Sequence, residues 1–101
     1  MNTNYPQRQI TGLRVKDGIL ALTVDGKDYQ FELAKFSRRL AHGTPLEQEA
    51  IRVSPASYGL HWPMLDEDLT IDGLIAGRIS SESDASLERW LRDRSNRPNA
   101  A

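Results

Sequence analysis

The first third of the chain alternates apolar and polar residues in three short runs, separated by Asp17-Gly18 and Asp25-Gly26. An Asp-Gly pair between strand-like runs favours a two-residue hairpin turn, because the turn needs positive φ at both central residues. We therefore predict an antiparallel three-stranded meander between Ile10 and Leu33. With two-residue turns, the apolar face contains four cross-strand pairs, namely Val15 with Leu20, Leu13 with Leu22, Leu22 with Tyr29, and Leu20 with Phe31.

The same register makes two further predictions about the meander. Ile10 and Ile19 fall on the opposite, polar face, and Gly12 lies opposite Thr23. Shifting either hairpin by one residue would scatter the apolar side chains over both faces, so turn chemistry and hydrophobic pattern support one register.

After Leu33 the apolar positions change from strand spacing to helical spacing. Those between Leu33 and Leu40 predict a helix of about two turns that ends near Gly43. The segment Thr44-Pro45-Leu46-Glu47 has the residues of a capping box with proline at the first helical position, which predicts a second short helix.

Residues 51–54 and 58–62 alternate around Pro55-Ala56-Ser57 and predict a second hairpin. Thr70 is suited to be the N-cap of a short helix that ends at Gly77, with an apolar residue on either side of the cap. A last helix is predicted from about Asp84 to Arg94. The side chains expected to point inward are Ile51, Val53, Tyr58, Leu60 and Trp62 in the hairpin, and Leu87, Trp90 and Leu91 in the last helix.

These elements define an α+β fold: an antiparallel three-stranded meander plus a second hairpin, with short helices packed on one face and a C-terminal helix. We expect residues 1–80 to form a single domain and residues 81–101 to form the C-terminal helix and a frayed tail. With 101 residues we expect no second domain.

Composition narrows the classes of function. Thirteen Lys and Arg against 14 Asp and Glu leave a net charge of -1, which attracts neither nucleic acid nor an anionic membrane over the whole molecule. The absence of cysteine excludes disulfides and thiolate metal sites. With no long apolar stretch, we expect no membrane span or signal peptide and a cytoplasmic location.

The segment 58–77 contains Trp62-Pro63-Met64-Leu65-Asp66-Glu67-Asp68-Leu69 and strongly resembles domain-of-unknown-function family 2442, in a branch with a Trp-Pro-x-Leu-Asp-Glu-Asp-Leu core. The resemblance extends to about Ser80, and Met64 departs from the more usual polar or acidic residue. It implies a small bacterial or phage-type domain with no established enzymatic activity. Such domains occur alone, fused to a helix-turn-helix, or beside small partner proteins in arrangements like toxin and antitoxin pairs. This chain has no room for a fused helix-turn-helix, so operator binding is not implied.

The Trp-Pro-acidic segment allows two interpretations. Packing explains Trp62-Pro63 as the end of a strand, and capping explains part of the acidic run 66–68 just before a helix start. The functional hypothesis is an acidic docking edge for another small protein, because three carboxylates exceed what one helix start needs. A metal site with the nearby histidine is disfavoured, since the spacing matches no usual ligand set. The candidate partner-binding residues are His61, Trp62, Asp66, Glu67 and Asp68.

We therefore expect a non-enzymatic protein-interaction or regulatory module, the partner or antitoxin-like member of a two-protein system, with no catalytic residue, cofactor or metal. The serines between Ser80 and Ser86 lack a nucleophile motif. A small enzyme or ligand-binding domain, using His61, Trp62 and residues 66–68, ranks third. The second hypothesis is a nucleic-acid-associated accessory protein, which would need a continuous positive stripe that joins Arg38 and Arg39 to Arg89, Arg92, Arg94 and Arg97.

Overall fold

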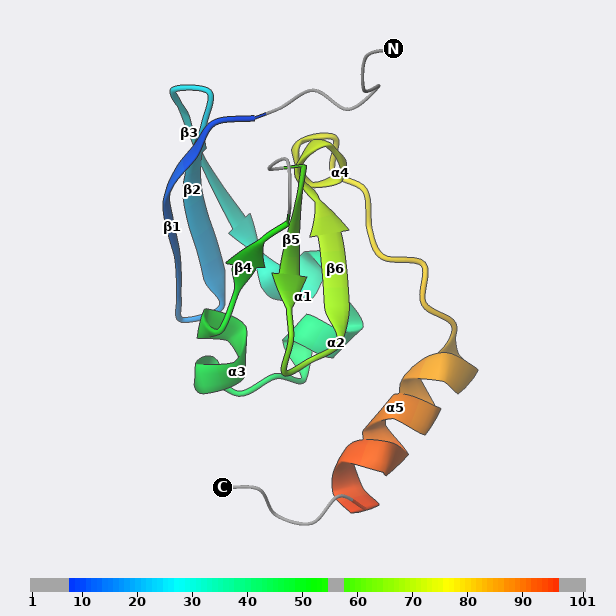
Figure 1. Ribbon diagram of the computed structural model, residues 1–101. Helices are drawn as coiled ribbons and strands as arrows, with labels where there is room; N and C mark the ends of the chain where they lie inside the picture. The colour runs from blue at the N-terminus through cyan, green and yellow to red at the C-terminus, as the bar shows by residue number, and fades with distance from the viewer. Residues whose placement is uncertain (1–7, 55–57, 97–101) are drawn as a thin grey trace.

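The computed structural model describes residues 8–54 and 58–96, which form two three-stranded antiparallel sheets, short helices and one longer C-terminal helix (Figure 1). The α+β class is therefore confirmed. In chain order the elements are β1 (Ile10–Lys16), β2 (Ile19–Val24), β3 (Lys27–Glu32), α1 (Leu33–Phe36), α2 (Arg38–Ala41), α3 (Pro45–Glu49), β4 (Arg52–Val53), β5 (Gly59–Trp62), β6 (Glu67–Thr70), α4 (Ile71–Ile75) and α5 (Asp84–Asn96).

The first sheet has the order β1-β2-β3 and confirms the predicted meander. All four residues of the two Asp-Gly turns have positive φ, between 50° and 84°, which is the backbone that a two-residue hairpin turn requires. The structure confirms three of the predicted cross-strand pairs, namely Val15 with Leu20, Leu22 with Tyr29, and Leu20 with Phe31.

A β-bulge in β1 corrects the rest of the predicted register. Arg14 pairs with Ala21 but Thr11 pairs with Thr23, so Gly12 and Leu13 together occupy the place opposite Leu22. Gly12 has φ +64°, a conformation that glycine adopts without strain.

Because of the extra residue, the side chains that precede it in β1 point to the opposite face of the sheet from the one predicted. Ile10 pairs with Val24 and packs half-buried against the core. The prediction that Ile10 lies on the polar face was therefore wrong, as was the pairing of Gly12 with Thr23.

The predicted two-turn helix after the meander is broken into α1 and α2 at Ser37. Ser37 has extended backbone (φ -154°) and is the N-cap of α2, where its Oγ accepts a hydrogen bond from the Leu40 N–H at 3.2 Å. A serine that accepts from the backbone three residues later begins a new helix rather than continuing the previous one. The helical spacing of the apolar residues concealed this break.

The helix starts at Thr44 and Thr70 are confirmed. Thr44 and Glu47 form both hydrogen bonds of a capping box at the start of α3, which has Pro45 in its first turn. The Thr70 side chain accepts from the Gly73 N–H at 2.9 Å at the start of α4. α5 also forms where its apolar stripe predicted it.

The second hairpin is confirmed as β4 and β5, but it belongs to a sheet of order β4-β5-β6. The sequence did not reveal β6, because the pattern predicts an acidic loop at residues 66–68 and the start of a helix at Leu69 and Thr70. The turn expected at residues 55–57 lies outside the described residues. Val53 and Tyr58 are about 40 % exposed instead of inward. Val53 lies in β4, a two-residue strand at the edge of the sheet, and Tyr58 lies just before β5.

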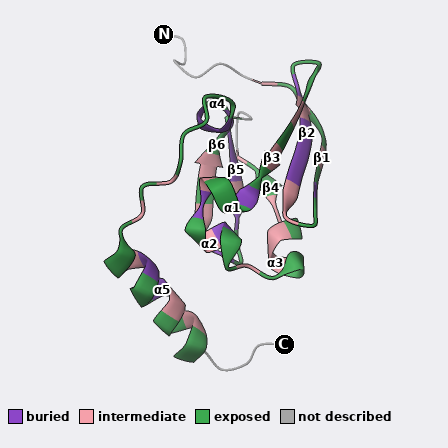
Figure 2. Cartoon of the chain, turned by 180° about the vertical axis from the view of Figure 1, so that it is seen from behind, coloured by how far each residue is buried: buried purple, intermediate pink, exposed green. Residues whose placement is uncertain are grey.

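The two sheets share one hydrophobic core, shown by the buried segments in Figure 2. α5 follows an extended segment after α4 (Figure 1) and contributes Leu87 and Trp90 to this core. None of the helices in the described ranges is long and apolar enough to cross a membrane. Among the described residues, the core side chains that are completely buried, at 0 % exposure, are Leu20, Leu33, Leu40, Leu60, Trp62 and Leu65.

Candidate functional site

The turn between β5 and β6 is fixed to the core by Trp62 and Leu65. Trp62 is completely buried, and its indole N–H donates to the Gln48 carbonyl oxygen at 3.0 Å. Leu65 is also completely buried, and its N–H donates to the Trp62 carbonyl oxygen at 3.2 Å. The geometry therefore supports the packing interpretation of Trp62, whose ring has no surface to offer a partner. Between these anchors, Pro63 and Met64 are exposed.

The acidic run does not form one continuous edge. Glu67 and Asp68 are adjacent in β6, so their side chains point to opposite faces of the sheet. Glu67 Oε2 accepts a hydrogen bond from Ser37 Oγ at 2.5 Å, while Asp68 Oδ1 lies 2.8 Å from Nδ1 of His61, its cross-strand partner. Asp66 precedes the strand with a positive φ of 53°.

The expectation that this run caps the following helix was wrong. The acidic residue in the first turn of α4 is Asp72, and the N-cap is the hydroxyl of Thr70. Asp66 lies in the turn, and Glu67 and Asp68 lie in β6, before the helix begins. One of the three carboxylates, Glu67, thus serves the fold through Ser37, while the side chains of Asp66 and Asp68 remain 82 % and 72 % exposed.

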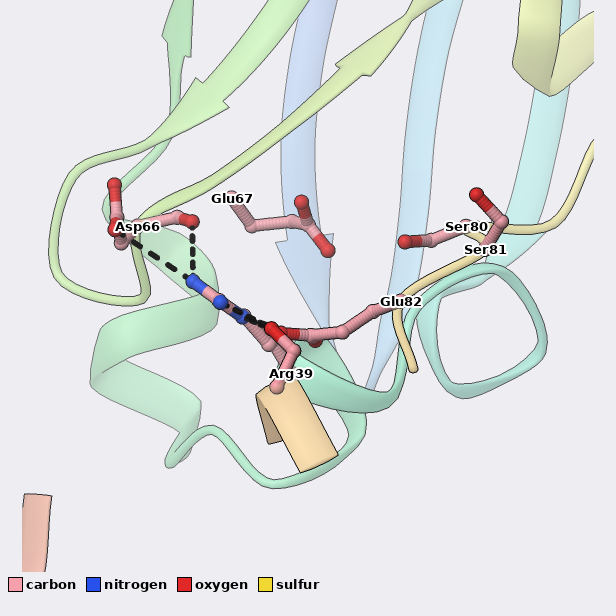
Figure 3. A pocket seen from close by; sticks show the side chains of 7 residues that line it. Arg39, Asp66, Glu67, Ser80, Ser81 and Glu82 are labelled. Carbon is pink, nitrogen blue, oxygen red and sulfur yellow. Dashed lines mark hydrogen bonds and ion pairs between the residues drawn. The ribbon is translucent and has the colours of Figure 1, made fainter. Parts of the chain in front are cut away.

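Arg39 of α2 joins the acidic turn to the C-terminal segment (Figure 3). Its guanidinium donates to the Asp66 carbonyl oxygen at 2.9 Å and pairs with Glu82 at 2.6 Å. It also lies 5.1 Å from the centre of the Trp90 ring, within cation-π distance. The hydrogen bond from Arg39 lowers the pKa of the Glu82 carboxyl below its usual value, so Glu82 stays ionised beside it.

A second ion pair holds the other end of α5. Arg94 donates to both carboxylate oxygens of Glu47, each at 3.0 Å, and its guanidinium lies 4.8 Å from the Trp90 ring centre. The hydrogen bond from Arg94 lowers the pKa of the Glu47 carboxyl. Trp90 is therefore flanked by Arg39 and Arg94, with only 8 % of its surface exposed.

The acidic turn borders a shallow hollow of about 310 Å³ with a polar lining (Figure 3). One guanidinium faces three carboxyl-bearing residues there, so the hollow has no surplus positive charge with which to bind a phosphate. Within the described ranges, no group of three or more His, Cys, Asp or Glu side chains could hold a metal ion. The lining residues are Arg39, Asp66, Glu67, Ser80, Ser81, Glu82 and Ser86.

The sequence pattern did not predict several contacts that hold the fold together. Ser37 was not singled out, and neither were the roles of Glu47 and Glu82 as partners of arginines. These ion pairs join residues 43 and 47 positions apart, which no local spacing rule can detect. The buried polar character of Ser37, at 2 % exposure, is likewise a property of the folded state.

The fold and the site together define a small α+β domain. In its Trp-Pro-acidic segment, Trp62, Leu65 and Glu67 hold the fold together. The chain belongs to the family described as protein of unknown function (DUF2442), whose model matches residues 10–80. The expected family is thereby confirmed, and α5 lies beyond the matched region.

Among solved structures, the chain is similar to a protein of unknown function from Rhodospirillum rubrum ATCC 11170. The two are 21 % identical, with a TM-score of 0.64, over 76 % of this chain and 95 % of that one. A likeness at this identity shows the shared fold. No curated protein matches the chain.

Proposed function

We propose that this protein is a non-enzymatic protein-interaction or regulatory module, the partner or antitoxin-like member of a two-protein system in the cytoplasm. The observation that carries the proposal is the exposed part of the family signature at the β5-β6 turn. Its buried residues explain the fold, but Met64, Asp66 and Asp68 have large exposed fractions. We define the docking tip as His61, Met64, Asp66 and Asp68.

The docking tip offers a partner both an apolar contact and charge. Met64 is 47 % exposed, and a flexible, polarisable side chain adapts to different partner surfaces. Asp66 and Asp68 lie on either side of Glu67, which is fixed to Ser37, so their backbone positions are held by the fold. A rigidly held turn of this kind fits a partner with basic side chains around a small apolar surface.

The test neutralises the two exposed carboxylates together, as Asp66→Asn with Asp68→Asn. Capture of the partner from the native host at low salt should fall, and the association rate should fall with it, while the melting temperature stays nearly unchanged. Glu67 is left intact because of its hydrogen bond to Ser37.

The matched control is Glu88→Gln with Asp93→Asn, which removes the same charge from two exposed positions of α5. This control should capture the partner as the unchanged protein does. If both double variants capture the partner as well as the unchanged protein does, docking at the tip is contradicted. If both lose capture to the same extent, the loss comes from the change in net charge and not from the docking tip.

The alternative of a nucleic-acid-associated accessory protein has less support from the geometry. Arg38 pairs with Asp84, while Arg39 and Arg94 pair with Glu82 and Glu47, so in the described part of the chain no continuous positive stripe forms. Arg89 and Arg92 are exposed, and Arg97 lies outside the described residues. Gel shifts at low and high salt distinguish the two functions, because binding to phosphate weakens steeply with salt.

A further inference from the structure

The outer edge of β3 differs from the other three sheet edges in the described part of the chain. β1 contains the Gly12 bulge and has α3 packed beside it. β4 has two residues, and in β6 the Asp68 N–H is occupied by Glu67 Oε1 at 3.0 Å. Bulges, short strands and covered groups all protect an edge from pairing with another chain. β3 has six residues in unbroken register and none of these protections.

The register shows which backbone groups of β3 point outward. The turn at Asp25-Gly26 closes on the pair of Val24 and Lys27, and the Leu33 N–H donates to the Gly18 carbonyl oxygen at 2.9 Å. Because hydrogen-bonded and non-hydrogen-bonded pairs alternate, Asp28, Gln30 and Glu32 direct N–H and C=O away from β2. In the described residues no further strand pairs with this side of β3, which is the edge of the order β1-β2-β3. The Glu32 carbonyl is the exception among the outward groups, because Glu32 is the N-cap of α1 and its carbonyl accepts in the first helical turn.

The side chains along this edge have two different chemistries. On the core side, Tyr29 and Phe31 are half-buried and stacked at 5.8 Å, and Phe36 meets Phe31 edge-on at 5.5 Å. On the other side, Asp28, Gln30 and Glu32 are exposed. Beside them lies a hollow of about 340 Å³, lined by Ile19, Gln30, Phe31, Glu32, Lys35 and Phe36.

We propose that β3 binds an extended segment of another protein, in which apolar residues alternate with Lys or Arg. Such a segment would pair with the outward N–H and C=O groups of Asp28 and Gln30 and with the N–H of Glu32. Its apolar side chains would lie against Tyr29 and Phe31, and its basic side chains would face the two carboxylates. The surface is separate from the docking tip, and the proposal does not depend on that function.

Charge selects this partner over a second copy of the chain. A two-fold antiparallel pairing that uses all three outward residues places Gln30 opposite itself and Asp28 opposite Glu32 of the copy. Like charges directly opposite each other destabilise a strand pair. A segment with basic residues at those two positions forms opposite-charge pairs instead.

The probe for the test is a short synthetic peptide in which lysine alternates with valine, added to the isotope-labelled full chain and followed by NMR. Amide signals of Asp28, Gln30 and Glu32 should shift, and their hydrogen exchange should slow by at least about tenfold, as expected for new backbone hydrogen bonds. A peptide of the same composition with its lysines and valines in separate blocks is the matched probe, and it should cause neither change.

The decisive variant is Gln30→Pro, which removes an outward N–H without touching a β2-β3 hydrogen bond. It should weaken peptide binding by at least about tenfold, or about 1.4 kcal/mol, while Gln30→Ala retains binding. If Gln30→Pro does not fold, Asp28→Lys with Glu32→Lys replaces it and should cause a similar loss.

Three results would overturn the proposal. The first is the absence of shifts along β3, and the second is equal binding of both peptides. The third is self-association of the chain in analytical ultracentrifugation that Gln30→Pro abolishes, which would assign the edge to a second copy.

Discussion

Trp62 is the residue of the family signature that we expect to contribute most to the stability of the fold. Its indole is completely buried and donates to the Gln48 carbonyl oxygen, which ties β5 to α3. Truncation to Trp62→Ala should destabilise the fold by about 3 to 5 kcal/mol, the usual cost of emptying a large aromatic site. Urea unfolding measures this difference, and Trp62→Phe should cost less because it fills more of the site. A loss below about 1 kcal/mol would instead indicate a ring that the core does not need.

Ser37 shows how one buried hydroxyl serves two elements. Its Oγ accepts from the Leu40 N–H at the start of α2 and donates to Glu67 in β6. A buried hydroxyl without partners would be costly, so these two hydrogen bonds explain how serine is tolerated at 2 % exposure. The same pair explains why Glu67 belongs to the fold and not to the exposed docking tip.

At the scale of elements, α5 is attached through ionised carboxylates and should therefore respond to acid. Glu47 and Glu82 have pKa values lowered by hydrogen bonds from Arg94 and Arg39, below their usual value of 4.5. A lowered pKa in the folded state means that the stabilisation is fully present above the unfolded pKa. It is lost as the pH falls through the folded pKa.

We expect α5 to loosen as the pH falls below the usual carboxyl value of 4.5, while the two sheets persist. The measurement is the NMR signal of the Trp90 indole N–H together with amide exchange in α5, followed as the pH is lowered. Glu47→Gln with Glu82→Gln should show the loosened helix already at neutral pH. Signals of α5 that stay unchanged well below the usual carboxyl pKa would contradict this attachment.

Local rules predicted the elements whose causes are local. The Asp-Gly turns, the capping box at Thr44 and the N-cap at Thr70 depend on residues within a few positions of one another, and each formed as expected. The bulge was missed because an isolated glycine in a strand marks a bulge only once the partner strand is known. With Gly12 taken as an ordinary position, Ile10 was placed on the wrong face.

The candidate site was less predictable because its contacts are long-range. In the sequence the three carboxylates of residues 66–68 form one acidic run, but strand alternation in β6 separates Glu67 from Asp68. The partners of Arg39 and Arg94 lie more than 40 positions away in the sequence. A sequence reading can find charged residues, but only the folded chain shows which of them neutralise one another.

At the scale of the whole molecule, the contacts of Arg39 should couple the acidic turn thermodynamically to the C-terminal helix. One guanidinium contacts the Asp66 carbonyl, Glu82 and the Trp90 ring. A change at any one of these three groups should therefore alter the contacts of Arg39 with the other two. Coupling of this kind is reciprocal.

If a partner bound at the turn draws Asp66 away from Arg39, amide exchange in α5 should quicken. Trp90→Ala should then change the affinity for that partner, although Trp90 is not part of the docking tip. Isothermal titration together with hydrogen exchange measures both directions of this coupling, and an effect in both directions is required if Arg39 carries it. The helix beyond the family domain would then modulate the affinity of the turn for its partner.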